Sequence, residues 1–183
     1  MTNLKFTDSL HFLVPSALYA LSNTLAFISL NYINPGLFHV FGNLRLLTAG
    51  ILYKVFMNRK QTDIQWCALF LIMFGAMLAS PVDMSEFKDS NTIIGIMITI
   101  LMCSASTCSS VYTEKIFKAS GDLSIFYKNI VLYLYGILVN MAFLLYNEPT
   151  LLSSGGFLTG WNFYTYLALL SQSAMGITLS FIF

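Results

Sequence analysis

Long apolar segments recur along this chain, and they constrain its fold more than any other feature. Six of them are long enough to cross a bilayer, which takes roughly 20 residues, and short polar stretches separate them. A backbone that crosses lipid must satisfy its own polar groups, which only helices and closed barrels do. Runs of this length and apolarity predict helices. The expected helices cover residues 10–30, 37–56, 64–80, 92–117, 124–146 and 161–183.

Composition agrees with a membrane protein. The chain has 183 residues, of which 57% are hydrophobic and 9% charged, whereas soluble domains carry about 25% charged residues. A net charge of +1 predicts no bulk electrostatic partner such as a nucleic acid. The three cysteines lie inside apolar segments, without metal-ligand spacing. We therefore expect an all-α, polytopic transmembrane helix bundle, in one domain over residues 1–183, with no metal and no cofactor.

Basic residues lie almost entirely on one side of the predicted membrane. If the helices alternate in direction, the N-terminus and the segments after the second and fourth helices share that side. The opposite segments are mainly acidic, with Lys88 as their only cation. Cytosolic loops are enriched in Lys and Arg, so the N-terminus is expected in the cytosol. The basic residues of this side are Lys5, Lys54, Arg59, Lys60, Lys115, Lys118 and Lys128.

Arg45 falls near the middle of the second apolar segment. A guanidinium there costs at least about 2.5 kcal/mol on insertion scales, unless it faces protein, water or an anion. Phe38, Gly42, Arg45 and Ala49 are spaced so that they share one helical face. A ring, a gap and a cation on one face suit an anion that carries a flat base. The alternatives are an arginine bonded to a neighbouring helix, and a small-residue groove for helix packing.

The fifth apolar segment repeats this spacing with polar residues. Asn129, Tyr133, Gly136 and Asn140 share one face, which is expected to line a water-filled or ligand-filled interior. In the first segment Asn23 lies near the centre. An interhelical hydrogen bond from such a residue contributes about 0.6–2 kcal/mol. Helix-to-helix bonding and ligand contact are therefore both open for Asn23.

Motifs of catalysis are absent from the sequence. It contains no HExxH, no GxSxG, no phosphate-cradling glycine loop and no paired carboxylates within an apolar segment. The polar groups inside these segments are those of Arg, Asn, Ser, Tyr and His. They bind polar solutes better than they break bonds, so the sequence favours transport or binding and argues against an enzyme.

Four stretches carry a resemblance to a known family. They are VPSALYALSNTLAFISLNYINPGLFHVFGNLR, MNRKQTDIQW, SSVYTEKIFK and YKNIVLYLYG. They resemble the nucleotide-sugar transporters, in the branch that includes CMP-sialic acid and UDP-galactose carriers. The third stretch is the most specific, because the family has Val-Tyr-Phe-Glu-Lys-Ile-Leu-Lys at the end of a helix. The resemblance covers nearly the whole chain.

The resemblance implies a fold, a location and an activity. The fold is that of drug/metabolite transporters, with ten helices in two inverted halves, of which about six are present here. The location is the Golgi membrane, or the ER membrane, as a multi-pass protein. The activity is antiport of a cytosolic pyrimidine nucleotide sugar for a lumenal nucleoside monophosphate. These two nucleotides and the lipid bilayer are the implied partners, and a homo-oligomer stays open.

The resemblance also implies site residues. The family's pocket asparagine falls on Asn23, its tyrosine at the start of the next helix on Phe38, and its buried lysine on Arg45. Its Asn-x-x-x-Tyr pair, which contacts the nucleotide, falls on Asn129 and Tyr133. Two positions depart from the family. Phe38 lacks the tyrosine hydroxyl, and Arg45 offers phosphate a planar fork where lysine offers a point charge.

Two functional hypotheses stay open. By this alignment the chain lacks counterparts of the family's first two and last two helices, and of a cationic site in the ninth. The sixth apolar segment also reaches Phe183 without a polar tail or a helix stop signal. The chain is then expected to be a truncated nucleotide-sugar antiporter. The alternative is a non-transporting membrane protein that packs with full-length relatives and modulates them.

Overall fold

A computed structural model describes residues 9–58, 60–79, 89–119, 124–147 and 160–182, and these are helical apart from short connections. The described part contains no strand. A single 3₁₀ turn, η1, precedes the first α-helix. The elements are η1 (Leu10–Phe12), α2 (Leu13–Leu30), α3 (Pro35–Gly42), α4 (Leu44–Met57), α5 (Asp63–Ala79), α6 (Ser90–Ala119), α7 (Ile125–Asn147) and α8 (Phe163–Ile182).

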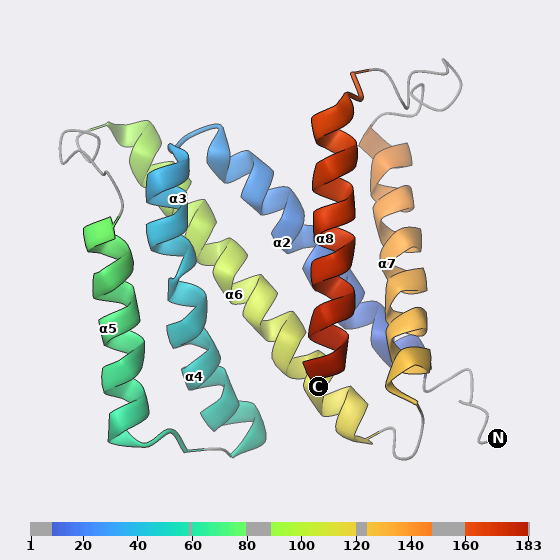
Figure 1. Ribbon diagram of the computed structural model, residues 1–183, viewed down its shortest axis with the longest axis horizontal. Coiled ribbons are helices and arrows are strands. Elements are labelled where there is room, and N and C mark those ends of the chain that lie inside the picture. Colours follow the sequence, from blue (N-terminus) through green and yellow to red (C-terminus); the bar gives the residue numbers. More distant parts are fainter. Residues whose placement is uncertain (1–8, 59, 80–88, 120–123, 148–159, 183) are drawn as a thin grey trace.

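Helices α2 and α6 form the centre of the bundle (Figure 1). Helix α6 packs along α2 and also contacts α3 and α4, which continue each other in space. Helix α5 lies outside α3 and α4, while α7 packs on the other side of α2. Helix α8 contacts α7 (Figure 1). The order across the molecule therefore places α2 and α6 between α4 and α7.

Small polar residues hold α2 against α6. The hydroxyl oxygen of Ser29 lies 3.0 Å from the carbonyl oxygen of Gly95, to which it donates, and 2.6 Å from the Thr99 hydroxyl. Further along the pair, the Ser109 hydroxyl donates to the Pro15 carbonyl at 2.7 Å. Small side chains let helix backbones approach closely in a membrane. Gly95, Thr99 and Ser109 of α6 therefore serve packing against α2.

The turn between α2 and α3 is built from local sequence signals. Asn34 precedes α3 with an extended backbone, and its side-chain oxygen accepts the Leu37 N–H at 2.8 Å. Pro35 occupies the first helical position, where its missing N–H costs nothing. The helix therefore begins at Pro35, two residues before the start expected from the apolar pattern.

The span expected over residues 37–56 is interrupted once, at Asn43, while Pro35–Met57 still has the length and apolarity of one membrane span. Asn43 stands between α3 and α4 in a turn. The Cys103 thiol of α6 donates to the carbonyl oxygens of Phe41 and Gly42, at 3.7 and 3.5 Å. A neighbouring helix thus satisfies carbonyl groups at the interruption, which is how broken helices are tolerated in membranes. The break lies two residues before Arg45.

The described helices show that the protein spans a membrane several times. Four spans are long and apolar enough to cross a bilayer: Leu10–Leu30, Pro35–Met57, Ser90–Ala119 and Ile125–Tyr146. Helix α5 is apolar but has 17 residues, and α8 has 20. These two lengths still fall within the range of about 17–25 residues seen for spanning helices. The chain is a polytopic membrane protein, and its described residues form helices without a strand.

Several of the basic residues lie at one end of the bundle. Figure 1 shows the end of α4, the end of α6 and the start of α7 at the same end of the molecule. These segments carry Lys54, Lys115 and Lys118, and Lys118 forms an ion pair with Glu114. Lys5, Arg59 and Lys88 belong to the predicted charge asymmetry but lie outside the described residues. Which end faces the cytosol stays a prediction.

Candidate functional site

Helix α7 contributes an amide nitrogen that has no hydrogen-bond partner among the described residues. Asn129 is half-buried, and its amide nitrogen is buried without a hydrogen bond among the described residues. Asn140, on the same predicted face, instead donates to the Gly136 carbonyl of its own helix at 2.7 Å. A buried donor left unsatisfied costs about 1–3 kcal/mol. The Asn129 amide nitrogen is therefore the donor on this face that a ligand or water would have to satisfy.

Tyr133 lies one turn after Asn129 and faces α8. Its side chain is 51% exposed. A Cβ added to Gly176 of α8 would stand 3.7 Å from the Tyr133 hydroxyl, so the phenol lies against the backbone of that helix. The phenol thus occupies the side of α7 that turns to α8, with its hydroxyl close to a position that has no side chain.

Lys128 fixes the start of this helix, and its burial was not foreseen from the sequence. Its side chain is only 4% exposed. The ammonium donates to the Phe117 carbonyl at 2.7 Å and lies 6.0 Å from the centre of the Phe117 ring. A cation in the first turn of α7 opposes the dipole of its own helix but complements the negative C-terminal end of α6. Lys128 therefore anchors α7 to the last turn of α6, next to Asn129.

Arg45 occupies the first turn of α4, near the middle of the span Pro35–Met57. Its side chain is exposed and lies beside Cys103 of α6. Its backbone carbonyl accepts hydrogen bonds from Thr48 at 3.0 Å and from Thr107 at 3.5 Å. Within the described residues no carboxylate forms an ion pair with Arg45. The backbone carbonyl is thus held by α6, while the guanidinium lies beside the Cys103 sulfur and can still bind an anion or water.

Phe38 and Asn23 complete the predicted set. Phe38 is half-buried on α3, with its ring edge-on to His39 at a centroid distance of 5.9 Å. Asn23 is exposed on α2. Its neighbour Ser22 is buried and donates to the Tyr19 carbonyl of the same helix at 2.9 Å. Asn23 therefore forms no hydrogen bond to another helix among the described residues, although such a bond was one of its two predicted roles.

The five predicted residues fall into separate groups. Phe38 and Arg45 lie on α3 and α4, whereas Asn129 and Tyr133 lie on α7, with α2 and α6 between these helices (Figure 1). Over the described ranges, no hydrogen bond, ion pair or ring contact joins any two of the five. The structure gives a cationic group and an amide–phenol group, and their assignment to one substrate site stays a prediction.

The sequence matches a known family and several known proteins over most of its length. The sequence model of the family described as "Nucleotide-sugar transporter" matches residues 2–183. CMP-sialic acid transporter 1 of Oryza sativa subsp. indica is 34% identical over 144 residues, which cover 75% of this chain and 44% of that protein. CMP-sialic acid transporter 4 of Arabidopsis thaliana is 28% identical over 171 residues, covering 93% of this chain and 49% of that protein.

These matches show what kind of protein this is, and how much of it the chain represents. The chain spans about half the length of the curated relatives it matches. The members named here are transporters and not enzymes, in keeping with the lack of catalytic motifs. An all-helical chain with several spans, a cation at mid-membrane and a family match from end to end leads to one conclusion. This chain belongs to the nucleotide-sugar transporter family.

Proposed function

We propose that this protein transports a pyrimidine nucleotide sugar, taken from the cytosol in exchange for a lumenal nucleoside monophosphate. The observation that carries the proposal is the family match over residues 2–183, together with Arg45, a cation near the middle of a membrane-length span that has no carboxylate partner among the described residues. The relatives named above are CMP-sialic acid transporters, so a CMP-linked sugar is the first substrate to test. The proposed location is the Golgi or ER membrane, with the N-terminus in the cytosol.

Each candidate residue has a role that its chemistry supports. Arg45 would hold the phosphate, because its guanidinium offers a fork of donors matched to phosphate oxygens. Phe38 would offer a ring face to the base. Asn129 would donate its unpartnered amide to an acceptor on the nucleotide, and Tyr133 would add a hydroxyl one turn later. Asn23, exposed on α2, would contribute a further amide.

A second candidate is a non-transporting protein that packs with full-length relatives. The observation in its favour is the exposure of large apolar side chains along the outer helices. Leu78 on α5 is 89% exposed, Tyr146 on α7 is 86% exposed, and Leu170 on α8 is 68% exposed. Such faces suit either lipid or a related chain. This candidate predicts no uptake by the purified protein and altered uptake when a full-length relative is present.

Uptake by proteoliposomes tests the proposal. Vesicles containing the purified protein and preloaded with CMP should accumulate labelled CMP-sialic acid faster than vesicles without internal nucleotide. UDP-galactose and GDP-mannose, a purine nucleotide sugar, complete the panel. The second candidate would be favoured by two results together. Vesicles that contain this protein alone would take up no nucleotide sugar, and vesicles that contain a full-length relative would change their uptake rate when this protein is added.

Two asparagines of α7 provide a matched pair of variants for this assay. Asn129→Leu removes the unpartnered amide and should lower uptake several-fold, since a hydrogen bond contributes about 0.5–1.5 kcal/mol. Asn140→Leu removes an amide that bonds within its own helix and should leave uptake near the wild-type rate. Equal losses in both variants, at equal folded protein, would contradict the role given to Asn129.

A further inference from the structure

The end of α4 and the start of α5 form a corner that the proposed substrate site does not use. Asn58 ends α4 with a left-handed backbone, φ 54°, and its N–H donates to the Tyr53 carbonyl. Thr62 and Gln65 then form a reciprocal pair: the Thr62 N–H donates to the Gln65 side chain at 2.9 Å, and the Gln65 N–H to the Thr62 hydroxyl at 3.4 Å. This capping box starts α5. The two helices are thus turned against each other within a few residues.

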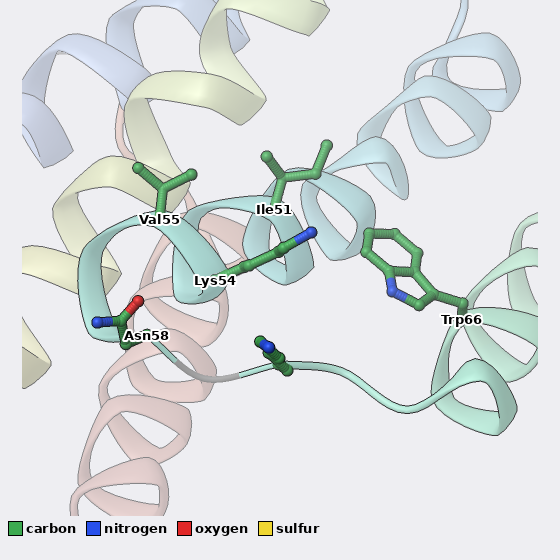
Figure 2. A pocket seen from close by; sticks show the side chains of 6 residues that line it. Ile51, Lys54, Val55, Asn58 and Trp66 are labelled. Carbon is green, nitrogen blue, oxygen red and sulfur yellow. The ribbon is translucent and has the colours of Figure 1, made fainter.

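The corner borders an open pocket of about 470 Å³ between the end of α4 and the start of α5 (Figure 2). The Lys54 side chain extends toward the Trp66 ring, across the face that also carries Ile51 (Figure 2). A Cβ added to Gly50 would stand 3.4 Å from the Trp66 ring, so the indole packs on the α4 backbone as a wall. The pocket is lined by Ile51, Lys54, Val55, Asn58, Lys60 and Trp66.

The lining combines two cations with apolar surface. Lys54 and Lys60 bring two ammonium groups, Asn58 brings an amide, and none of the six lining residues is acidic. Ile51 and Val55 give an apolar side. A free anion needs the cations but gains nothing from the apolar residues. A phospholipid uses both, because its phosphate and its glycerol and acyl groups are joined.

The position of the pocket fits the same ligand. It lies where the span Pro35–Met57 ends, and the end of a spanning helix is expected at the boundary between hydrocarbon and water. Tryptophan is enriched at this depth, and basic pockets between membrane helices bind anionic headgroups. Solvated lysines that merely extend to the interface would need neither the packed indole nor the capped corner.

We propose that this pocket binds the phosphate of an anionic phospholipid headgroup. The chemistry it recognises is a phosphate group beside an apolar chain, and inorganic phosphate shares only the first part. The inference does not depend on which solute the protein carries. It adds a lipid site at the α4–α5 corner, distinct from Arg45 and from the α7 residues.

Tryptophan fluorescence gives a direct test, because the chain has 2 tryptophans and one of them lines the pocket. The Trp161→Phe variant, delipidated in a neutral detergent, reports on Trp66 alone. Phosphatidylserine, phosphatidylcholine and inorganic phosphate are titrated separately. Phosphatidylserine should saturate the signal at the lowest concentration. Lys54→Gln and Lys60→Gln should each raise the phosphatidylserine concentration at half-saturation about fivefold. Lys54→Arg keeps the charge and should keep the wild-type value.

Two control variants separate this site from general charge and from the substrate site. Lys115→Gln removes an exposed lysine of α6, and Arg45→Ala removes the proposed phosphate ligand of the substrate. Both should leave the phosphatidylserine titration unchanged. Equal responses to phosphatidylserine and phosphatidylcholine, insensitive to Lys54 and Lys60, would overturn the proposal. Saturation by inorganic phosphate as readily as by phosphatidylserine would keep an anion site and overturn the lipid as its occupant.

Discussion

Replacing Arg45 with alanine should weaken nucleotide-sugar binding by roughly ten- to a hundredfold. A hydrogen bond to a charged group contributes about 1.5–3 kcal/mol, and about 1.4 kcal/mol corresponds to a factor of ten. Arg45 lies near mid-membrane, where the binding sites of transporters are usually found. The measurement is the affinity of purified, folded variant for CMP-sialic acid, with expression compared separately.

The structure indicates that the Arg45→Ala variant should fold. The Arg45 carbonyl accepts the hydrogen bonds from Thr48 and Thr107 that hold the backbone here, so Arg45→Ala should still fold. Arg45→Lys should keep much of the affinity, because lysine is the residue that the family resemblance implies here. Lys115→Ala removes an exposed cation elsewhere and should leave affinity unchanged. Wild-type affinity in well-folded Arg45→Ala protein would rule out phosphate binding by this residue.

Replacing Gly95 with alanine should destabilise the whole bundle. An added Cβ would stand 2.5 Å from Ile33 Cγ2 and 2.9 Å from Tyr32 Cβ. Tyr32 Cβ is tied to its backbone and Ile33 is 5% exposed, so neither has room to move aside. Overpacking of this kind costs about 1–3 kcal/mol. The measurement is the thermal unfolding midpoint in detergent, which should fall by several degrees.

Gly75 provides the control for helix propensity. A Cβ added there would meet nothing within 4 Å among the described residues. Alanine is favoured over glycine inside a helix by about 1 kcal/mol, so Gly75→Ala should leave the midpoint unchanged or raise it. A midpoint that rises in both variants would show that the close approach of α6 to residues 32 and 33 is not rigid.

The fold could be predicted from the sequence wherever the pattern of a single helix determines it. Apolar length was enough to predict membrane-spanning helices and to place them approximately. The break at Asn43 could not be predicted, because residues 35–57 read as one apolar run of spanning length. At the break, Cys103, a residue of α6 about sixty positions later, bonds the carbonyls of Phe41 and Gly42. Such a contact leaves no local pattern.

The candidate site could likewise be predicted only in those features that a single helix determines. Helical spacing correctly places Asn129 and Tyr133 one turn apart on α7, because spacing is a property of one helix. It could not show that Asn129 lacks a partner while Asn140 bonds to its own helix. It also could not show the burial of Lys128, which results from the packing of α7 on the end of α6. Distances between helices are set by tertiary packing alone.

Equilibrium binding tests the central claim, recognition of a nucleotide-linked phosphate within the membrane, most directly. Purified protein should bind labelled CMP-sialic acid saturably, with competition by CMP and none by free sialic acid, because the phosphate and base carry the proposed contacts. The Arg45→Ala variant should show that binding weakened ten- to a hundredfold, by the estimate above. Folded protein that binds none of the nucleotide sugars, or binds free sialic acid as well as CMP-sialic acid, would contradict the account.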